Sequence, residues 1–310
     1  MFSLNKPFKI TLFLVVAVLA LTNVISAPIA LLSGFLFTFL WGNPFPKESK
    51  TTINWLLKIS VIGLGFGMQL QKTIETGKEG FVLTFFSIVL TLCLGVYLGR
   101  ILKINKSTAY LISGGTAICG GSAIAAISSV IKAKEKEISI ALGVVFFLNA
   151  VAIFVFPAVG HSLNLSQHEF GLWSAIAIHD TSSVVGASMA YGQEALDLAI
   201  TVKLARALWI IPVSIVSMYV FKSKNEKIKI PWFILGFIIA ILLNSYLKLP
   251  AFFVETIPSF SKSLLVLTLF LVGAGLSIES IKESGFKPIL LGSVLWTVIS
   301  IGSLLFIILI

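Results

Sequence analysis

Long apolar stretches separated by short polar segments occupy nearly the whole chain. A helix that crosses a membrane needs about 20 mainly apolar residues, and most of these stretches come close to that length. The pattern predicts helices over residues 10–21, 24–41, 53–70, 81–98, 108–131, 138–159, 170–189, 198–221, 232–247, 264–280 and 289–310. The first two stretches are short, so we expect them to form a tight, tilted hairpin broken near Asn23 and Pro28.

The composition excludes a water-soluble fold. Hydrophobic residues make up 57% of the 310 residues and charged residues only 12%, whereas a soluble domain carries about 25% charged residues. The predicted fold class is an all-α polytopic membrane protein with about nine to eleven transmembrane segments. No stretch is left for a separate catalytic domain, so we expect neither an enzyme nor a cofactor. Cys93 and Cys119 both lie inside apolar stretches, which argues against a disulfide framework and a thiolate metal site.

The formal net charge of +10 comes from cations that gather in the short polar segments. Cytoplasmic loops of membrane proteins collect Lys and Arg, so we assign the excess to topology and expect no nucleic-acid partner. If every stretch crosses and the N-terminus is cytoplasmic, the inside loops hold 13 Lys and Arg and the outside loops hold 7. If stretches 108–131 and 170–189 instead dip in and return, the counts become 16 and 4. The charges favour the two-return topology, and eleven full crossings stay the alternative.

Two internal echoes indicate a repeat. Residues 56–77 align without a gap with residues 264–285 and share six identities in 22 positions. A second, weaker echo aligns Ser113 with Ser174, Ser122 with Ser183 and Ala126 with Ala187. In the two-return topology both echoes run in opposite directions across the bilayer, which is the inverted-repeat arrangement of many secondary transporters.

The echoes also predict the domain organisation. We expect a single transmembrane domain over residues 1–310, with a first half at about 10–160 and a second half at about 170–310. The two re-entrant or broken stretches would then occupy corresponding places in the two halves.

The stretch 108–131 carries two glycine pairs, which break a helix. At membrane depth an unwound backbone persists only where protein or a watery cavity satisfies its amides. The start of the following half-helix then offers free N–H groups and a partial positive charge to an anion. We therefore predict that Thr116, Gly120, Gly121 and Ser122 line a binding site. The alternative is close helix packing through small residues.

The stretch 170–189 places two ionisable residues, His179 and Asp180, midway along an apolar segment. Ionisable residues at this depth are costly unless they are paired or hydrated, so both are candidates for function, with Ser183 beside them. His179 could carry a proton because its unperturbed pKa of about 6.5 lies near physiological pH; the alternative is a neutral, hydrogen-bonded histidine that fixes a helix contact. No ligand spacing recurs around His179, so no metal is expected.

In the stretch 198–221, Lys203 and Arg206 lie three residues apart and share one helix face. With Asp180 they form a predicted buried cluster that keeps one positive charge in excess. An anionic substrate would balance that charge, and the planar fork of Arg suits oxyanions. The alternative is an internal salt bridge, with Lys203 extending toward a headgroup.

The run from Gly115 to Ala126, the sequence Ile-Lys-Ala-Lys-Glu that begins at Ile131, His179-Asp180 and Val-Lys-Leu-Ala-Arg from Val202 resemble the bacterial YeiH-like sulfate exporter family. The likeness spans nearly the whole chain. In the family Glu usually follows the His, so Asp180 is a shorter carboxylate, and Ala205 is often Thr. The resemblance implies an inner-membrane carrier related to bile-acid/sodium symporters and cation/proton antiporters, with inverted repeats and broken helices.

From these observations we predict a secondary transporter of a small anion, such as sulfate or a sulfonate, in the bacterial inner membrane with a cytoplasmic N-terminus. The substrate would bind Arg206, Lys203 and the amides near Gly120, and His179 or Asp180 would couple its movement to protons. Two alternatives are a cation/proton antiporter that uses Asp180 and a non-transporting scaffold or passive channel. Substrate identity, direction of transport and a homodimer stay open.

Overall fold

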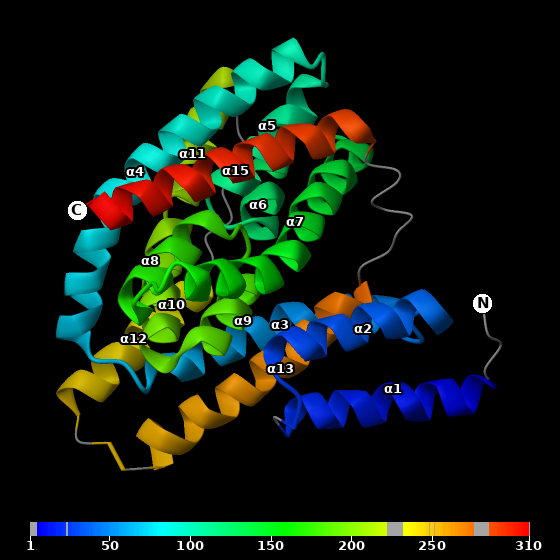
Figure 1. The fold of residues 1–310 in the computed structure, drawn as a ribbon, viewed down its shortest axis with the longest axis vertical. Coiled ribbons are helices and arrows are strands. Elements are labelled where there is room, and N and C mark those ends of the chain that lie inside the picture. The colour runs from blue at the N-terminus through cyan, green and yellow to red at the C-terminus, as the bar shows by residue number, and fades with distance from the viewer. Residues whose placement is uncertain are drawn as a thin grey trace.

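The computed structural model consists of helices joined by short turns, and the residues that it describes contain no strand. These residues are 5–22, 24–221, 232–247, 249–250, 252–275 and 285–309. Every predicted apolar stretch contains a helix. Five helices within the described ranges are long and apolar enough to cross a membrane, which confirms the all-α polytopic fold class. The helices form two bundles that lie one above the other in Figure 1.

The lower bundle, here called the side bundle, combines the first three helices of the chain with helices from residues 232–275 (Figure 1). It contains α1 (Lys6–Leu21), α2 (Ala27–Trp41), α3 (Pro46–Gly65), α12 (Trp232–Tyr246), the π-helix η1 (Phe252–Thr256) and α13 (Ile257–Gly275). Helices α1, α2 and α3 each begin with a proline in the first turn, where its fixed φ and missing N–H do no harm. Helices α3 and α13 run antiparallel, since Gly63 faces Ser261 and Gly67 faces Pro258.

The third predicted helix was misplaced by several residues. It was expected over 53–70, but α3 runs from Pro46 to Gly65, and a turn then separates it from the next helix. Two physical reasons account for the shift. Pro46 sets an early start, and the backbone at Gly65 lies directly against the backbone of Phe237 in α12. The tenth predicted helix ends at Gly275 in α13, and the residues predicted to continue it to 280 lie outside the described residues.

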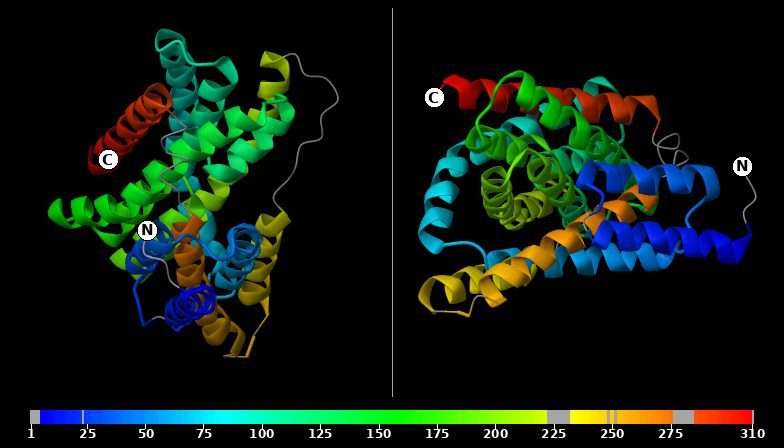
Figure 2. Two further views of the ribbon diagram at one scale, coloured as in Figure 1. Left: turned by 90° about the vertical axis from the view of Figure 1, so that its right-hand side faces the viewer. Right: turned by 60° about the horizontal axis from the view of Figure 1, so that its bottom comes forward.

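The upper bundle, here called the hairpin bundle, contains the stretches with the predicted breaks. It contains α4 (Leu70–Ile101), α5 (Lys106–Ala117), α6 (Gly121–Val130), α7 (Glu135–Ser162), α8 (Gln167–Ala177), α9 (Thr181–Tyr191), α10 (Gln193–Ala207), α11 (Ile210–Val220) and α15 (Phe286–Leu309). Helices α15 and α1 lie on opposite sides of the molecule (Figure 2).

Helices α5 and α6 fold back on each other as a first helical hairpin. Gly114 faces Ile127 and Gly115 faces Ile124, so the two helices run antiparallel. At the base, the Asn105 side chain caps α5 by accepting from the amides of Ser107 and Thr108 at 2.9 and 3.4 Å. The hairpin therefore starts and ends at the same side of the bundle.

Helices α8 and α9 form a second hairpin of similar size. Ser174 Oγ lies 2.9 Å from Ser188 Oγ across the two helices. At the base, Gln167 Oε1 accepts from the amide of Glu194 at 3.0 Å, and Tyr191 OH donates to the carbonyl of Leu165 at 2.6 Å. Both predicted breaks are thus present, and both segments return to the side from which they came.

The two hairpins enter from opposite ends and meet tip to tip. The single helix α7, 28 residues and about 42 Å long, leads from the base of the first hairpin to the base of the second. The α10–α11 segment is also 28 residues long. It leads from the base of the second hairpin back to that of the first, where Ser217 Oγ lies 2.8 Å from Tyr110 OH in α5. These equal lengths agree with the repeat suggested by the sequence echoes, which stays a prediction.

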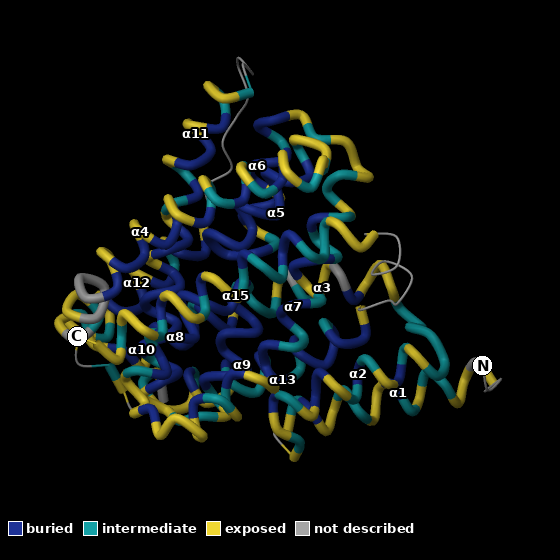
Figure 3. Tube along the Cα trace, turned by 45° about the horizontal axis from the view of Figure 1, so that its top comes forward, coloured by how far each residue is buried: buried dark blue, intermediate teal, exposed yellow. Residues whose placement is uncertain are grey.

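Residues of the central hairpins are more buried than those of the outer helices (Figure 3). Eight of the eleven residues of α9 are buried, and ten of the twelve residues of α5 are buried. Large apolar side chains of α1, α4 and α15 are exposed, for example Val18, Phe86 and Leu305, as expected for surfaces that face lipid. Helix α9 contacts α2 and α13, where Leu269 packs against Gly186. Helices α5 and α9 are therefore enclosed, while the outer helices are not.

The two hairpin bases should be reachable from opposite sides of the membrane. Lys134 and His168 are exposed, one at each base. In a Cys93→Ala background, we expect a membrane-impermeant maleimide to label His168→Cys in intact spheroplasts, and Lys134→Cys only after the membrane is opened. Labelling of Lys134→Cys in intact spheroplasts would contradict the charge-based orientation.

Candidate functional site

The first hairpin breaks at Ile118–Gly120. Gly120 has φ +62° and ψ −123°, a backbone conformation that only glycine adopts without strain. Helix α6 starts at the next residue without a side-chain cap; the N–H of Ala123 faces the Cys119 sulfur. Gly121 is half-buried and Ser122 is exposed at this helix start. The first turn of α6 therefore presents amides and a partial positive charge without a charged or hydroxyl cap.

The second hairpin breaks at Ile178–Asp180, and Asp180 caps the helix that follows. Its carboxylate accepts from the Ser182 amide at 3.1 Å and from the Ser182 hydroxyl. The Asp180 amide donates to Asn149 Oδ1 in the middle of α7 at 3.2 Å. The positive end of α9 is thus compensated by a carboxylate, as expected at a helix N-terminus.

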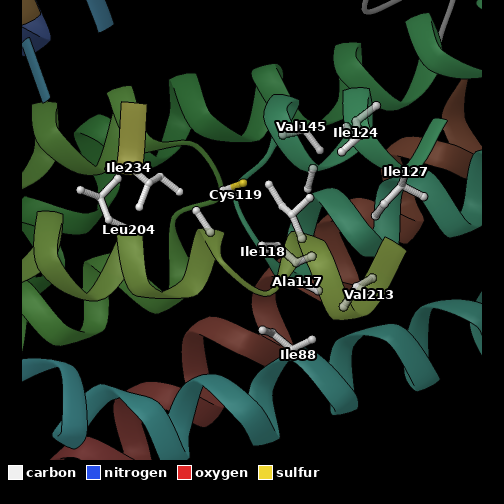
Figure 4. Packing of buried hydrophobic residues seen from close by; sticks show 14 of the residues in the cluster. Ile88, Ala117, Ile118, Cys119, Ile124, Ile127, Val145, Leu204, Val213 and Ile234 are labelled. Atoms are coloured by element: carbon white, nitrogen blue, oxygen red, sulfur yellow. The ribbon is translucent and has the colours of Figure 1, made fainter. Parts of the chain in front are cut away.

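The two tips touch. A Cβ at Gly120 would lie 3.2 Å from Cβ of Asp180, so the two breaks pack against each other with no room for a side chain between them. Figure 4 shows Ile118 and Cys119, from the first break, packed among apolar side chains of the surrounding helices, including Val145 and Leu204. The contact fixes the relative position of the two hairpins.

Lys203 and Arg206 are fully buried beside the tips, near the middle of the α10–α11 segment. Lys203 Nζ donates to the carbonyls of Ala175 and Ile178 at 3.2 and 2.6 Å. Arg206 Nε donates to the carbonyl of Ala117 at 2.8 Å, and Nη1 donates to the carbonyl of Ile176 at 3.0 Å. These carbonyls belong to the ends of α5 and α8, where the last carbonyls of a helix have no amide donors of their own.

Four half-helix ends therefore meet at the tips, and three of them are compensated. Arg206 compensates the carbonyl end of α5, Lys203 and Arg206 together compensate that of α8, and Asp180 compensates the amide end of α9. The amide end of α6 lacks a comparable group. Lys203 and Arg206 against Asp180 leave a formal excess of one positive charge, since the partial charges of two amide and two carbonyl ends cancel.

Several buried polar atoms around the tips have no hydrogen-bond partner among the described residues. They are Thr116 Oγ1, Asn149 Nδ2, both ring nitrogens of His179 and Arg206 Nη2. Asn149 Nδ2, Arg206 Nη2 and the Thr116 hydroxyl can all donate a hydrogen bond. The His179 ring lies near the backbone of Val145 and within electrostatic range of Lys203 and Arg206. Buried donors are normally satisfied, so this set points to a ligand or water that accepts hydrogen bonds.

A cavity of about 770 Å³ opens at the base of the second hairpin. It lies between that base and the α3–α4 turn, and it extends along α10 to Thr201, two residues before Lys203. Its charged and titratable lining residues are Glu75, His168, Glu194 and Asp197. The cavity therefore opens at one face of the protein, at the base of the second hairpin.

The structure brings together most of the site residues predicted from the sequence. Thr116, Gly120, Asp180, Lys203 and Arg206 all lie at or beside the tips, and Gly121 and Ser122 begin α6 there. Ser183 is buried in the first turn of α9, and His179 is buried beside it.

Two features of the site were not predicted. Asn149 was not among the predicted site residues, yet its side chain accepts from the Asp180 amide at the second tip. Lys203 and Arg206 were predicted to form a buried cluster with Asp180 that binds an anionic substrate. The sequence did not predict that their hydrogen bonds go to backbone carbonyls. Within the described ranges, no three His, Cys, Asp or Glu side chains form a group that could hold a metal ion.

Gly120 should tolerate substitution less well than any other residue of the first tip. We expect Gly120→Ala to lower the free energy of unfolding by about 1–3 kcal/mol, because the new Cβ requires a strained φ and ψ and meets Asp180. Gly121→Ala is the matched control, since its Cβ meets the ends of two side chains, Phe146 at 3.3 Å and Leu142 at 3.6 Å. Thermal unfolding in detergent measures both; equal losses would contradict the geometry of the break.

Comparison with known proteins agrees with the membrane fold. The family described as "Conserved hypothetical protein 698" matches residues 8–292. A UPF0324 membrane protein of Bacteroides thetaiotaomicron is 51% identical over 289 residues, covering 91% of this chain and 86% of the relative. Another from Shewanella oneidensis is 47% identical over 304 residues, covering 98% of this chain and 96% of the relative. No solved structure matches.

The names of these relatives identify membrane proteins and no activity. The match extends from the start of α1 into α15, so it includes both hairpins and the α10–α11 segment that holds them. The chain belongs to the family described as conserved hypothetical protein 698, whose relatives are UPF0324 membrane proteins.

Proposed function

We propose that this protein is a secondary transporter of a small oxyanion, such as sulfate or a sulfonate, and that the anion binds at the start of α6. The observation that carries the proposal is the uncompensated amide end of α6 beside buried, unpartnered donors. A helix N-terminus is a ready anion site, because its amides point outward and its partial charge is positive.

The charge at the tips supports an anion over a neutral substrate. Lys203 and Arg206 exceed Asp180 by one positive charge, and all three lie within electrostatic range of the Cys119 thiol at the first tip. A bound anion would balance this excess where solvent screening is weak. Without it, an unbalanced buried charge would destabilise the closed protein.

Individual residues take distinct roles in this proposal. Arg206 holds both hairpins through two carbonyls and keeps Nη2 for an oxygen of the anion. The amides of Gly121 and Ser122 and the hydroxyl of Thr116 bind further oxygens. Lys203 balances charge from the carbonyl side without touching the anion. His179 and Asp180 couple transport to protons, because ionisable groups at membrane depth can change charge with the state of the carrier.

Transport requires that the tips open to each face in turn. The 770 Å³ cavity already reaches from one face along α10. The hairpin bundle meets the side bundle through α9 with α2 and α13, which offers a boundary along which the bundles can move. An ion gradient would drive the cycle, since the sequence carries no nucleotide-binding motif. Bacterial inner-membrane placement with a cytoplasmic N-terminus is part of this proposal.

One observation favours the cation/proton antiporter that uses Asp180 as a second candidate. The cavity presents the carboxylates of Glu75, Glu194 and Asp197, which attract cations. In that candidate, Asp180 would exchange its hydrogen bonds from Ser182 for a metal cation or a proton. The scaffold or passive-channel alternative gains no such support.

Arg206→Lys separates the two candidates. Lysine keeps the positive charge, but its single ammonium lacks the planar fork with which Arg206 reaches two carbonyls and presents Nη2. We expect sulfate uptake into proteoliposomes to fall about tenfold or more, because the anion loses one charge-assisted hydrogen bond. Radiolabelled sulfate uptake with and without a pH gradient, beside ²²Na⁺ exchange, provides the measurement. Cation exchange that survives while sulfate is never transported would favour the antiporter.

Ser122→Asp tests the anion site, because we expect it to preserve or raise stability while it abolishes sulfate uptake. A carboxylate in the first turn of α6 compensates the helix end, so we expect unchanged or higher stability, by about 0.3–1 kcal/mol. The same carboxylate repels an anion, so sulfate uptake should be lost. Ser122→Asn is the neutral control of similar size, and it should retain uptake. Normal sulfate uptake by folded Ser122→Asp would rule out a site at the start of α6.

A further inference from the structure

We propose that the carbonyl oxygens of Ala175 and Ile178 form a cation site whose resident cation is the ammonium group of Lys203. Lys203 Nζ lies 3.2 Å from the first oxygen and 2.6 Å from the second. The consequence of this site for the coupling of transport to Na⁺ rests on the proposed transport function, whereas the cation site itself rests on these contacts.

The position of these carbonyls explains why they attract a cation. They lie at the end of α8, which is eleven residues long, and in the break that follows it. The last carbonyls of a helix lack amide partners and carry a partial negative charge. In membrane transporters, unwound backbone carbonyls and half-helix carbonyl ends are the groups that coordinate Na⁺. The end of α8 thus has the chemistry of an alkali-metal site.

The ammonium of Lys203 lies at the carbonyl end of α8, in the position that a bound metal ion would take. The side chain is fully buried. Within the described residues, both hydrogen bonds of its ammonium go to these backbone carbonyls, and the Asp180 carboxylate accepts from Ser182 instead. A cation held by neutral carbonyls, and not by a carboxylate partner, is arranged like a bound metal ion. It differs in being covalently tethered to α10.

The tether has a consequence for coupling. A free Na⁺ in this place would make transport depend on external Na⁺, since the carbonyl end of α8 would be compensated only when the ion was bound. Lys203 supplies the donor from the chain itself, so the carrier needs no alkali-metal cation to assemble its second tip. Lys203 is therefore the residue that sets the cation independence of the site.

Removing the tether should turn the site into one for a free cation. Lys203→Ala leaves the two carbonyls without their donor and leaves space where the side chain was. Lys203→Met fills a similar volume without charge and blocks the space. The probe is NaCl, replaced stepwise by N-methyl-D-glucamine chloride at constant chloride and ionic strength; the large organic cation serves as the reference. Propylammonium chloride tests a cation that also restores the missing side-chain atoms.

The expected result is a saturable rise of several degrees in the unfolding temperature of purified Lys203→Ala with Na⁺ or propylammonium. Wild type and Lys203→Met should show no such rise. If Lys203→Ala is too unstable to purify without small cations, the yield of monodisperse protein extracted with and without propylammonium replaces the unfolding temperature. Equal behaviour of Lys203→Ala in all cations, by either measurement, overturns the cation site.

The same samples keep this inference separate from the anion proposal. Sulfate at constant Na⁺ should stabilise wild type whether or not the cation site exists. Sodium-independent sulfate uptake by wild type, with sodium-dependent uptake by Lys203→Ala, supports the coupling consequence. Sodium-dependent uptake by wild type overturns it. Absence of any sulfate effect counts against the anion proposal and leaves the cation result standing.

Discussion

The structure depends on how four half-helix ends are compensated inside a membrane protein. Two hairpins end their first helices with carbonyls at one buried place, and each of these carbonyls needs a hydrogen-bond donor there. Lys203 and Arg206 reach from the middle of the α10–α11 segment to bind those carbonyls, and they join the two hairpins through shared contacts with α5 and α8. An isolated buried cation would be costly, but a cation that satisfies a carbonyl end removes two penalties at once.

This constraint also explains where function can arise. Asp180 and Asn149 position the second tip, and the first tip is held by Gly120 against Asp180 and by Arg206. The start of α6 is left with amides that its own residues do not cap by a side chain. Charge and hydrogen-bond donors are therefore concentrated near one helix start, where the two tips meet. A scaffold would gain nothing from that arrangement, whereas a carrier of small anions uses each part of it.

Part of this arrangement could be predicted from the sequence. The apolar stretches predict the helices, the glycine pairs predict the first break, and loop charges such as Lys134 indicate that both broken segments return. The partners of Lys203 and Arg206 could not be predicted, because backbone carbonyls carry no residue-type signal. The amide of Asp180 and the side chain of Asn149 are 31 positions apart, and no local pattern connects them. The packing of α13 against α2 and α3 likewise depends on contacts between the two ends of the chain.

The most direct test of the central claim is the protection of a single cysteine at the start of α6. Ser122 is exposed there, so Ser122→Cys in a Cys93→Ala background should react with a small maleimide in purified protein, while the buried Cys119 stays unreactive. The account predicts that sulfate or another small oxyanion slows this reaction saturably, and that Na⁺ at equal ionic strength does not. A reaction rate that no oxyanion changes, but that a cation does, would contradict it.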